Sequence, residues 1–477
     1  MIHRARTASL PKLVAAGLMF VFVLMAVPRQ WRSNGSRQPV VNQLQPPSAP
    51  SSYEVHAVDY LPSGHVTDGS VDYTEELQCA LDAAAGRLLR LPDFPVLVRP
   101  KASQPYCLLA PATIRVVGTH ASRLTTDVGG VQVLRAEHVH GAHFEGFSIR
   151  GVGGDGSDMA HGLLQVTWGK DVRVRDVMVC QADADGIAIA NVEGVLVHGC
   201  TVEGASKSAL YLSDCSDATV SDNRVSDFGG HTWGGGLVIG VGIQLSSNAD
   251  LSCNGNLVQD GVGIGILCGA LSGGAPPRAN SLVGNRVLDV SNPSNLNASG
   301  GIRLVNSSSD KDTQTLLSAN AVRGCGAHGI YVQDHGGSSI VGNNVVESQR
   351  AGLLVSTVED LWVAGNLVLA SDTEQTGYSA GIQLINAARR VVAHGNHIAP
   401  SALFGPASDK QHVLDQSSGG GHSLEPRVTW GEAPPIGTPS RRGDVIYDTQ
   451  PHVGGHVGWV CVQAGVPGNW RPFGAID

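Results

Sequence analysis

A single pattern of apolar and polar positions recurs along most of this chain. Each copy opens with a small residue, an aliphatic residue, any residue and a second aliphatic residue, as in Gly329-Ile-Tyr-Val and Gly352-Leu-Leu-Val. After a turn and a second alternating stretch, it closes with Asn, any residue and an aliphatic residue, as in Asn343-Asn-Val and Asn366-Leu-Val. Both pairs are 23 residues apart. Repetition at a fixed period of this length indicates a protein built from stacked repeats.

Each repeat holds three short stretches in which apolar and polar residues alternate. None has the length or the period of a helix, so we predict three β-strands in each repeat. Stacking would place each strand in parallel beside its copy in the next coil. The recurring Asn would then lie at the same turn of every coil, where its amide can hydrogen-bond the coils above and below. A propeller or a leucine-rich repeat fits less well, because the first needs about 40 residues per blade and the second needs a helix.

These repeats resemble the right-handed parallel β-helix of the pectate-lyase-like superfamily over residues 66–403. The resemblance implies an all-β fold, a single-stranded right-handed parallel β-helix (a solenoid). Residues 72–86 are similar to the superfamily's N-terminal capping helix, since their apolar residues share one helical face. These are Leu77, Ala80, Leu81 and Ala84. One departure is Cys200, which replaces the Asn of its coil.

The N-terminus carries an export signal. Residues 13–27 form an unbroken apolar run that follows Arg4, Arg6 and Lys12, and this order is typical of a secretion signal. The run is shorter than the roughly 20 residues of a spanning helix, but its cleavage site is weak. We therefore interpret residues 1–28 as a signal peptide or a signal anchor. The body is expected to be secreted or extracytoplasmic, with a membrane contact only through an uncleaved anchor.

Three segments lie outside the repeats. Residues 29–65 are rich in Pro, Gln and Ser and are predicted to be a flexible linker. Residues 404–440 are expected to be a loop-rich connector, and residues 441–477 a small β-rich module. The module resembles short C-terminal segments of secreted and phage-appendage β-helix proteins, which cap, oligomerise or bind glycans. A homotrimer is therefore one hypothesis. The module's predicted core consists of Trp459, Trp470 and Phe473.

Composition and charge narrow the function. Glycine supplies 61 of 477 residues and charged residues only 15%, which fits a β-rich protein with many turns. The net charge of −9 argues against nucleic acid as a partner, because phosphate binding needs a basic surface. None of the nine cysteines forms a CxxC pair, so no zinc site is indicated. Cys79 and Cys107 flank one short segment and are the predicted disulfide, the others being interpreted as buried thiols.

Superfamily members that act on glycans hold them along the outside of the first strand of each coil, and outward residues can be identified here because strand side chains alternate. Tyr and Gln suit sugar rings and hydroxyl groups, and Arg303 suits a uronate carboxylate. No carboxylate is predicted to point outward from these strands. The predicted substrate-binding residues are Tyr211, Gln244, Tyr331, Gln333 and Trp233.

Carboxylates occur instead in the turns that enter these strands. Asp183-Ala-Asp185-Gly resembles the carboxylate motif of the polygalacturonase-like branch, and glycoside hydrolysis needs two carboxyl groups about 5 to 9.5 Å apart. Elimination from a uronate needs a base and neutralisation of the carboxylate instead, with Ca²⁺ as the cofactor that this route can use. The catalytic candidates are Asp183, Asp185, Lys207, His231 and Arg303; Tyr211, His328 and Tyr331 are further candidates for the elimination route. Because Asp is common in turns, plain turn formation remains the alternative for Asp183 and Asp185.

Two classes of function stay open at this point. The first is an exported polysaccharide-active enzyme, either a glycoside hydrolase or a polysaccharide lyase or epimerase, working in a groove along the first-strand face. The second is a non-catalytic glycan-binding or structural surface or spike protein. In both, the partner is a polysaccharide, and fold alone does not decide between them.

Overall fold

The structure is a computed structural model of the chain. It describes residues 53–477, apart from 103, 155–161, 231, 234–235, 238–239, 271–275, 293–298, 308–312, 370–380, 400–412, 425–427 and 438–439. The predicted export signal therefore lies outside the described residues. Among the described residues, no helix has the length and apolar character needed to cross a membrane.

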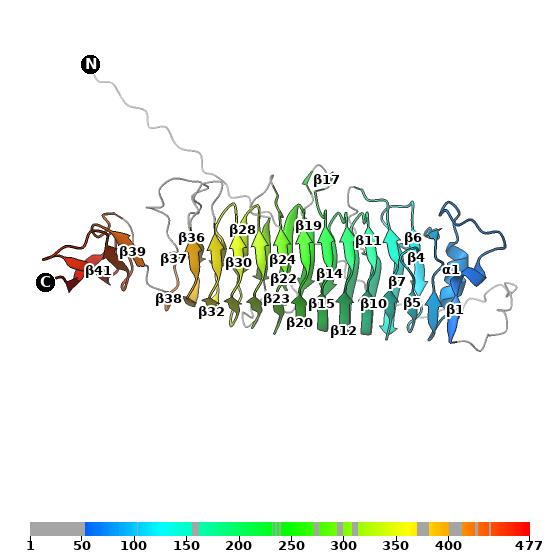
Figure 1. The fold of residues 1–477 in the computed structure, drawn as a ribbon. Coiled ribbons are helices and arrows are strands. Elements are labelled where there is room, and N and C mark those ends of the chain that lie inside the picture. Colours follow the sequence, from blue (N-terminus) through cyan, green and yellow to red (C-terminus); the bar gives the residue numbers. More distant parts are fainter. Residues whose placement is uncertain are drawn as a thin grey trace, which may run out of the picture. The chain divides into compact units, whose positions relative to one another are not determined.

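The chain winds into a parallel β-helix whose coils each contribute one strand to three parallel ladders (Figure 1). The first ladder consists of β4 (Tyr106–Ala110), β7 (Gln132–His140), β10 (Gly162–Arg175), β12 (Asp185–His198), β14 (Ser208–Ser213), β19 (Gly240–Ser246), β22 (Gly263–Ala270), β25 (Gly300–Asn306), β28 (His328–Gln333), β31 (Leu353–Ser356), β34 (Ile382–Asn386) and β37 (Val413–Ser417).

The second ladder follows each of these strands after a corner. It consists of β1 (Glu54–His56), β2 (Leu88–Arg90), β5 (Arg115–Val117), β8 (His143–Glu145), the second halves of β10 and β12, β15 (Ser216–Ser221), β20 (Ala249–Asn254), β23 (Ser281–Val283), β26 (Leu316–Ser318), β29 (Ser339–Val341), β32 (Glu359–Ala364), β35 (Arg389–His394) and β38 (Ser423–Leu424).

The third ladder forms a separate sheet. It consists of β3 (Pro95–Leu97), β6 (Arg123–Thr125), β9 (Ser148–Arg150), β11 (Met178–Cys180), β13 (Thr201–Glu203), β16 (Arg224–Ser226), β21 (Leu257–Gln259), β24 (Arg286–Leu288), β27 (Ala321–Arg323), β30 (Asn344–Val346), β33 (Leu367–Leu369) and β36 (His397–Ala399). The predicted three strands per repeat are thus confirmed. The ladders also include β37 and β38, which lie in the segment that we interpreted as a connector.

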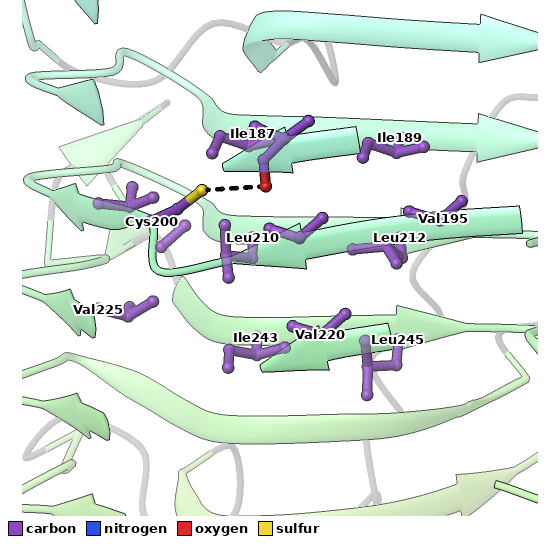
Figure 2. Packing of buried hydrophobic residues seen from close by; sticks show 14 of the residues in the cluster. Ile187, Ile189, Val195, Cys200, Leu210, Leu212, Val220, Val225, Ile243 and Leu245 are labelled. Atoms are coloured by element: carbon purple, nitrogen blue, oxygen red, sulfur yellow. Dashed lines mark hydrogen bonds between the residues drawn. The ribbon is translucent and has the colours of Figure 1, made fainter. Parts of the chain in front are cut away.

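The interior of the coils is filled by aliphatic side chains from all three ladders. Ile187, Leu210 and Ile243 are direct neighbours in the first ladder and stack inside the helix (Figure 2). All three are fully buried, and burying such a side chain contributes roughly 1.5–3 kcal/mol. Because strands pair in register, every coil repeats the same inward positions, and the outward positions are fixed with them.

The recurring Asn residues connect coil to coil. The side-chain amide nitrogen of Asn256 donates to Oδ1 of Asn285 at 2.9 Å, and that of Asn285 donates to Oδ1 of Asn320 at 3.0 Å. The same bonds continue through Asn343, Asn366 and Asn396. Each of these Oδ1 atoms also accepts the backbone N–H of the preceding Asn. The row therefore satisfies buried polar groups at one turn of the coil.

A short helical segment covers the N-terminal coils. It consists of η1 (Ala57–Tyr60) and α1 (Thr74–Ala83), and Asp72 accepts hydrogen bonds from the backbone N–H and the hydroxyl of Thr74 at the start of α1. The predicted apolar face is buried in the same core as the coils. It contains Leu77, Ala80, Leu81 and Ala84.

The C-terminal unit is a four-stranded sheet of β39 (Val428–Gly431), β40 (Val445–Asp448), β41 (His456–Gln463) and β42 (Asn469–Ala475). A short hairpin of β17 (Thr232–Trp233) and β18 (Gly236–Leu237) completes the elements. The predicted aromatic core of the C-terminal unit is only half-buried, and its buried hydrophobic side chains in the described residues are Ile446 and Cys461. So small a sheet lacks the interior for three large rings.

The predicted disulfide between Cys79 and Cys107 is wrong. All nine cysteines are free thiols. Cys79 lies on the exposed side of α1, whereas Cys107 is buried in β4 with its Sγ 3.9 Å from Oγ1 of Thr126. The two side chains face different environments. Apart from Cys79 and the half-buried Cys180, the thiols are buried, as the sequence interpretation expected.

Candidate functional site

The outward side chains of the first ladder form two continuous rows, because the strands pair in register. We call them the first and second outward rows, and neighbours within a row are roughly 4.8 Å apart. The first outward row is Arg135, Gln165, Ala188, Tyr211, Gln244, Leu267, Arg303, Tyr331, Leu354 and Gln383. The second is Glu137, Thr167, Ala190, Ser213, Ser246, Gly269, Val305, Gln333, Ser356 and Ile385.

The first polar group on this face is centred on Asp185, the first residue of β12. Its side chain is only 4% exposed, and its Oδ1 accepts the backbone N–H of Ser208 at 2.9 Å. The Ser208 hydroxyl donates to Oε1 of Gln244 at 2.8 Å, and Nε2 of Gln244 donates to Oγ of Ser246 at 3.1 Å. We call these four residues the Asp185 network. Each of its members already has a hydrogen-bond partner inside the protein.

Burial determines the protonation of Asp185. It raises the pKa of the carboxyl group to about 6, although the hydrogen bond from Ser208 and the nearby charge of Lys207 both lower it. Lys207 is half-buried just before β14. Tyr211, one coil away in the first outward row, is also half-buried, and burial raises the pKa of its hydroxyl.

Asp183 lies outside this network. Its carboxylate accepts the backbone N–H of Gly130, in the loop before β7. Asp183 and Asp185 therefore both accept a hydrogen bond from a backbone N–H of another coil, a common structural role for a carboxylate. Glycoside hydrolysis instead needs two carboxyl groups that both reach the scissile bond.

A second polar group begins at Arg303, two coils beyond Gln244 in the first outward row. The guanidinium carbon of Arg303 in β25 is 4.9 Å from the ring centre of Tyr331 in β28. The Tyr331 hydroxyl donates to Oε1 of Gln333 at 2.7 Å, and Nε2 of Gln333 donates to Oδ2 of Asp334 at 3.1 Å. The ring of His328 lies 6.0 Å from that of Tyr331. We call these five residues the Arg303 cluster.

The charge of Arg303 is not neutralised by an ion pair with any described carboxylate, unlike that of Arg135 in the same row, which pairs with Glu137. The Nε of Arg303 is buried without a hydrogen-bond partner in the described part of the chain. Burial lowers the pKa of this guanidinium and raises that of the Tyr331 hydroxyl. Burial, and then the charges of Arg350 and Arg303, lower the pKa of His328 to about 4.

The structure thus brings the sequence-predicted residues into two groups. Gln244 and Asp185 belong to one, and Arg303, Tyr331 and Gln333 to the other. His231 lies outside the described residues, and Trp233 lies in β17 with its side chain outside them. Three members, Ser208, Ser246 and Asp334, were not predicted as site residues. Ser208 occupies the repeat position of Asp185, so an alignment of the repeats would have indicated it.

No group of three or more His, Cys, Asp or Glu side chains in the described ranges is placed to hold a metal ion. Ca²⁺ therefore stays a prediction from the elimination route, with no ligand set assigned to it. The polar groups that the described outward rows offer are amides, hydroxyls, the ion pair of Arg135 with Glu137 and the guanidinium of Arg303. The prediction that no carboxylate points outward from the first strands is therefore wrong for Glu137.

Comparison with known proteins agrees with this architecture. The family described as "Right handed beta helix region" matches residues 127–311, and the family described as "Periplasmic copper-binding protein (NosD)" matches residues 278–410. A search of curated protein sequences gave no significant match.

Several solved structures share the fold at low sequence identity. The A-modules of the Azotobacter vinelandii mannuronan C-5 epimerases AlgE4 and AlgE6 superpose with TM-scores of 0.55 and 0.52 at 17% and 15% identity. Each comparison covers 78% of this chain and 99% of the module. The catalytic unit of a Streptomyces thermodiastaticus α-1,3-glucanase gives a TM-score of 0.52 at 15% identity, covering 79% of this chain and 69% of that one.

The chain is a right-handed parallel β-helix protein. The all-β solenoid fold that the repeats indicated, a right-handed parallel β-helix, is confirmed. The neighbours include enzymes that act on different polysaccharides, so the fold leaves the reaction open.

Proposed function

We propose that this protein is an exported polysaccharide-active enzyme that holds an acidic glycan along the two outward rows and cleaves it by elimination at the Arg303 cluster. The observation that carries the proposal is the half-buried Arg303, whose guanidinium lies against Tyr331, whose Nε is buried without a hydrogen-bond partner and which makes no ion pair within the described chain. Export is supported by the apolar run at residues 13–27 and its preceding basic residues.

Burying a charge without a counter-ion is costly, so such a group usually serves a ligand. A guanidinium presents two parallel N–H groups that match a carboxylate. Uronate residues carry a carboxylate on each sugar, and Arg303 lies in a row that is continuous along the coils. An acidic polysaccharide lying along this row would supply the missing negative charge.

The neighbouring groups suit elimination. The proton on the carbon next to the uronate carboxylate moves to the neutral imidazole of His328, and the bond to the leaving oxygen breaks as a carbon–carbon double bond forms. The leaving oxygen takes the proton of the Tyr331 hydroxyl, which its raised pKa keeps protonated. Arg303 neutralises the carboxylate. Once the substrate carboxylate neutralises the guanidinium, the positive charge of Arg303 no longer lowers the pKa of His328 to the same extent. The imidazole then becomes a stronger base.

Hydrolysis is less well supported by the geometry. The two nominated carboxylates, Asp183 and Asp185, already accept backbone N–H groups. The same observation favours the second candidate function, a non-catalytic glycan-binding protein that uses the rows only for binding. Homotrimer formation and membrane anchoring remain hypotheses from the sequence of the two termini.

The test compares purified wild-type protein with Arg303→Met, which keeps the packing on Tyr331 and removes the charge. Affinity for uronate and neutral polysaccharides is measured by calorimetry, and products by reducing ends and by the ultraviolet absorbance of unsaturated uronates. We expect the variant to lose about 100-fold in uronate affinity and all absorbance. Arg135→Met is the matched control, because Arg135 lies in the same row and is already paired with Glu137.

Each outcome decides between the functions. Absorbance in the wild-type protein that disappears in Arg303→Met supports the lyase. Reducing ends without absorbance would instead support a hydrolase. Uronate binding that is lost in the variant, without any product, would support the binding protein. Equal affinity of wild type and Arg303→Met for every uronate polymer would refute the assigned site.

A further inference from the structure

Trp168 stands out among the exposed residues beside the outward rows. It follows Thr167 of the second outward row at the corner where β10 passes from the first ladder to the second. Its side chain is 52% exposed, and its backbone has a φ of 60°. A positive φ is a left-handed conformation that is strained for a bulky residue.

The equivalent corner of neighbouring coils shows what this position normally requires. The register places His138, Asn191 and Asp214 beside or near Trp168 in the same corner row, and each also has a positive φ. Asn, Asp and His are the residues enriched in this conformation, because their polar side chains tolerate it. A Trp here costs stability and exposes a large apolar ring, and strain of this kind concentrates at functional sites.

We infer that Trp168 is a binding residue for the glycan, a ring on which one sugar of the polymer stacks beside the second outward row. The inference rests on the proposed function. An indole suits this task because it combines a flat apolar face with an N–H that stays in water. The apolar C–H face of a pyranose can cover the ring while the sugar hydroxyls stay solvated.

The position of Trp168 makes this role specific. It lies five coils before Arg303 in the first ladder, which at roughly 4.8 Å per coil is about 24 Å along the rows. A sugar on Trp168 is therefore remote from the Arg303 cluster. Only a long chain can reach both, so the residue should determine affinity for polymers and leave short oligosaccharides unaffected.

The experiment uses Trp168→Asn, which installs the residue found in the next coil. Trp362→Ser is the matched control: Trp362 is 48% exposed, but it lies in β32 of the second ladder, next to Ser339. Affinities for a uronate polymer and for a short uronate oligosaccharide are measured by calorimetry, and thermal stability by differential scanning calorimetry. Trp168→Phe tests rescue by another aromatic ring.

We expect Trp168→Asn to weaken polymer binding about tenfold, to leave oligosaccharide binding unchanged and to melt at the same or a higher temperature. Trp168→Phe should recover part of the affinity, and Trp362→Ser should bind like wild type. Wild-type affinity of Trp168→Asn for the polymer would overturn the inference alone. So would a loss of affinity accompanied by a lower melting temperature, which would indicate a structural role. If the wild-type protein binds no polysaccharide at all, the proposed function fails and the inference with it.

Discussion

The Asp185 network and the Arg303 cluster lie on the same face of the same ladder, yet they differ in whether the protein itself supplies a partner for the charged group. The carboxylate of Asp185 accepts a hydrogen bond from the protein itself, from the backbone N–H of Ser208. Arg303 is stacked on Tyr331 and has no ion pair among the described residues. The proposed division follows from this difference: the polar group whose hydrogen bonds are made inside the protein serves the fold, and the one that leaves an interaction unmade is the proposed ligand-binding group.

The two groups also respond to pH in opposite directions. Burial raises the pKa of the Asp185 carboxyl to about 6 and lowers that of the His328 imidazole to about 4. Each group is therefore favoured in its neutral form in the fold. Acid should weaken the fold at His328, whereas base should weaken it at Asp185.

The largest expected effect is that of His328→Gln at low pH. The unfolded imidazole binds a proton below its ordinary pKa of 6.5, and the folded one only below about 4. The wild-type fold therefore loses about 3 kcal/mol at this residue as the pH falls through that interval. Gln does not titrate, so the variant should gain that amount relative to wild type between about pH 8 and pH 4.

Denaturant titrations of both proteins at several pH values measure this difference. Its sign is the informative part, because a His that is protonated in the fold would give the reverse trend. A stability difference between His328→Gln and wild type that stays constant over the range would contradict the neutral, buried imidazole on which the proposed elimination depends.

Asp185→Asn is expected to give a slightly smaller effect of opposite sign. The pKa of Asp185 is raised from 3.8 to about 6, so the wild-type fold is favoured below the lower value and loses about 3 kcal/mol as the pH rises through the upper one. Asn still accepts the Ser208 N–H through its amide oxygen. The variant should therefore match wild type near pH 4 and be more stable near pH 8.

The same variant tests function. If Asp185 serves structure, product formation by Asp185→Asn should stay within about twofold of wild type. The sequence alone suggested a catalytic role, for which the variant would be inactive. An inactive but stable Asp185→Asn would indicate that the carboxylate is catalytic. The Asp185 network would then not be purely structural, and the contrast with the Arg303 cluster would fail.

The fold could be predicted from sequence because it depends on a period. Ile302 and Leu304 must point into the coil, so Arg303 must point outward, and every repeat gives the same answer. The Asn row followed from the same repetition. The repeat pattern could not predict strands whose sequences depart from it. One example is β37, which pairs with β34 although a long insertion precedes it.

The site was predictable only in part, for a related reason. Asp185 lies where a turn becomes a strand, and a shift of one residue there moves a side chain from the solvent to the interior. The sequence therefore offered it as an exposed turn carboxylate, whereas it is buried. The partner of Asp185 comes from the next coil, which an isolated motif does not reveal. Trp168 was missed because alternation says nothing of corner residues.

The smallest expected effect is the coupling between Lys207 and Asp185. The half-buried Lys207 lowers the pKa of Asp185 and so opposes the effect of burial. Lys207→Ala should therefore destabilise the fold near pH 8 by less than about 1 kcal/mol and have no effect near pH 4, where Asp185 is neutral. In the Asp185→Asn background the effect should vanish, and a double-mutant cycle at both pH values measures that coupling. If Lys207→Ala instead weakens glycan binding and leaves the pH dependence unchanged, Lys207 is a ligand-binding residue like Arg303. It then does not belong with the structural residues around Asp185.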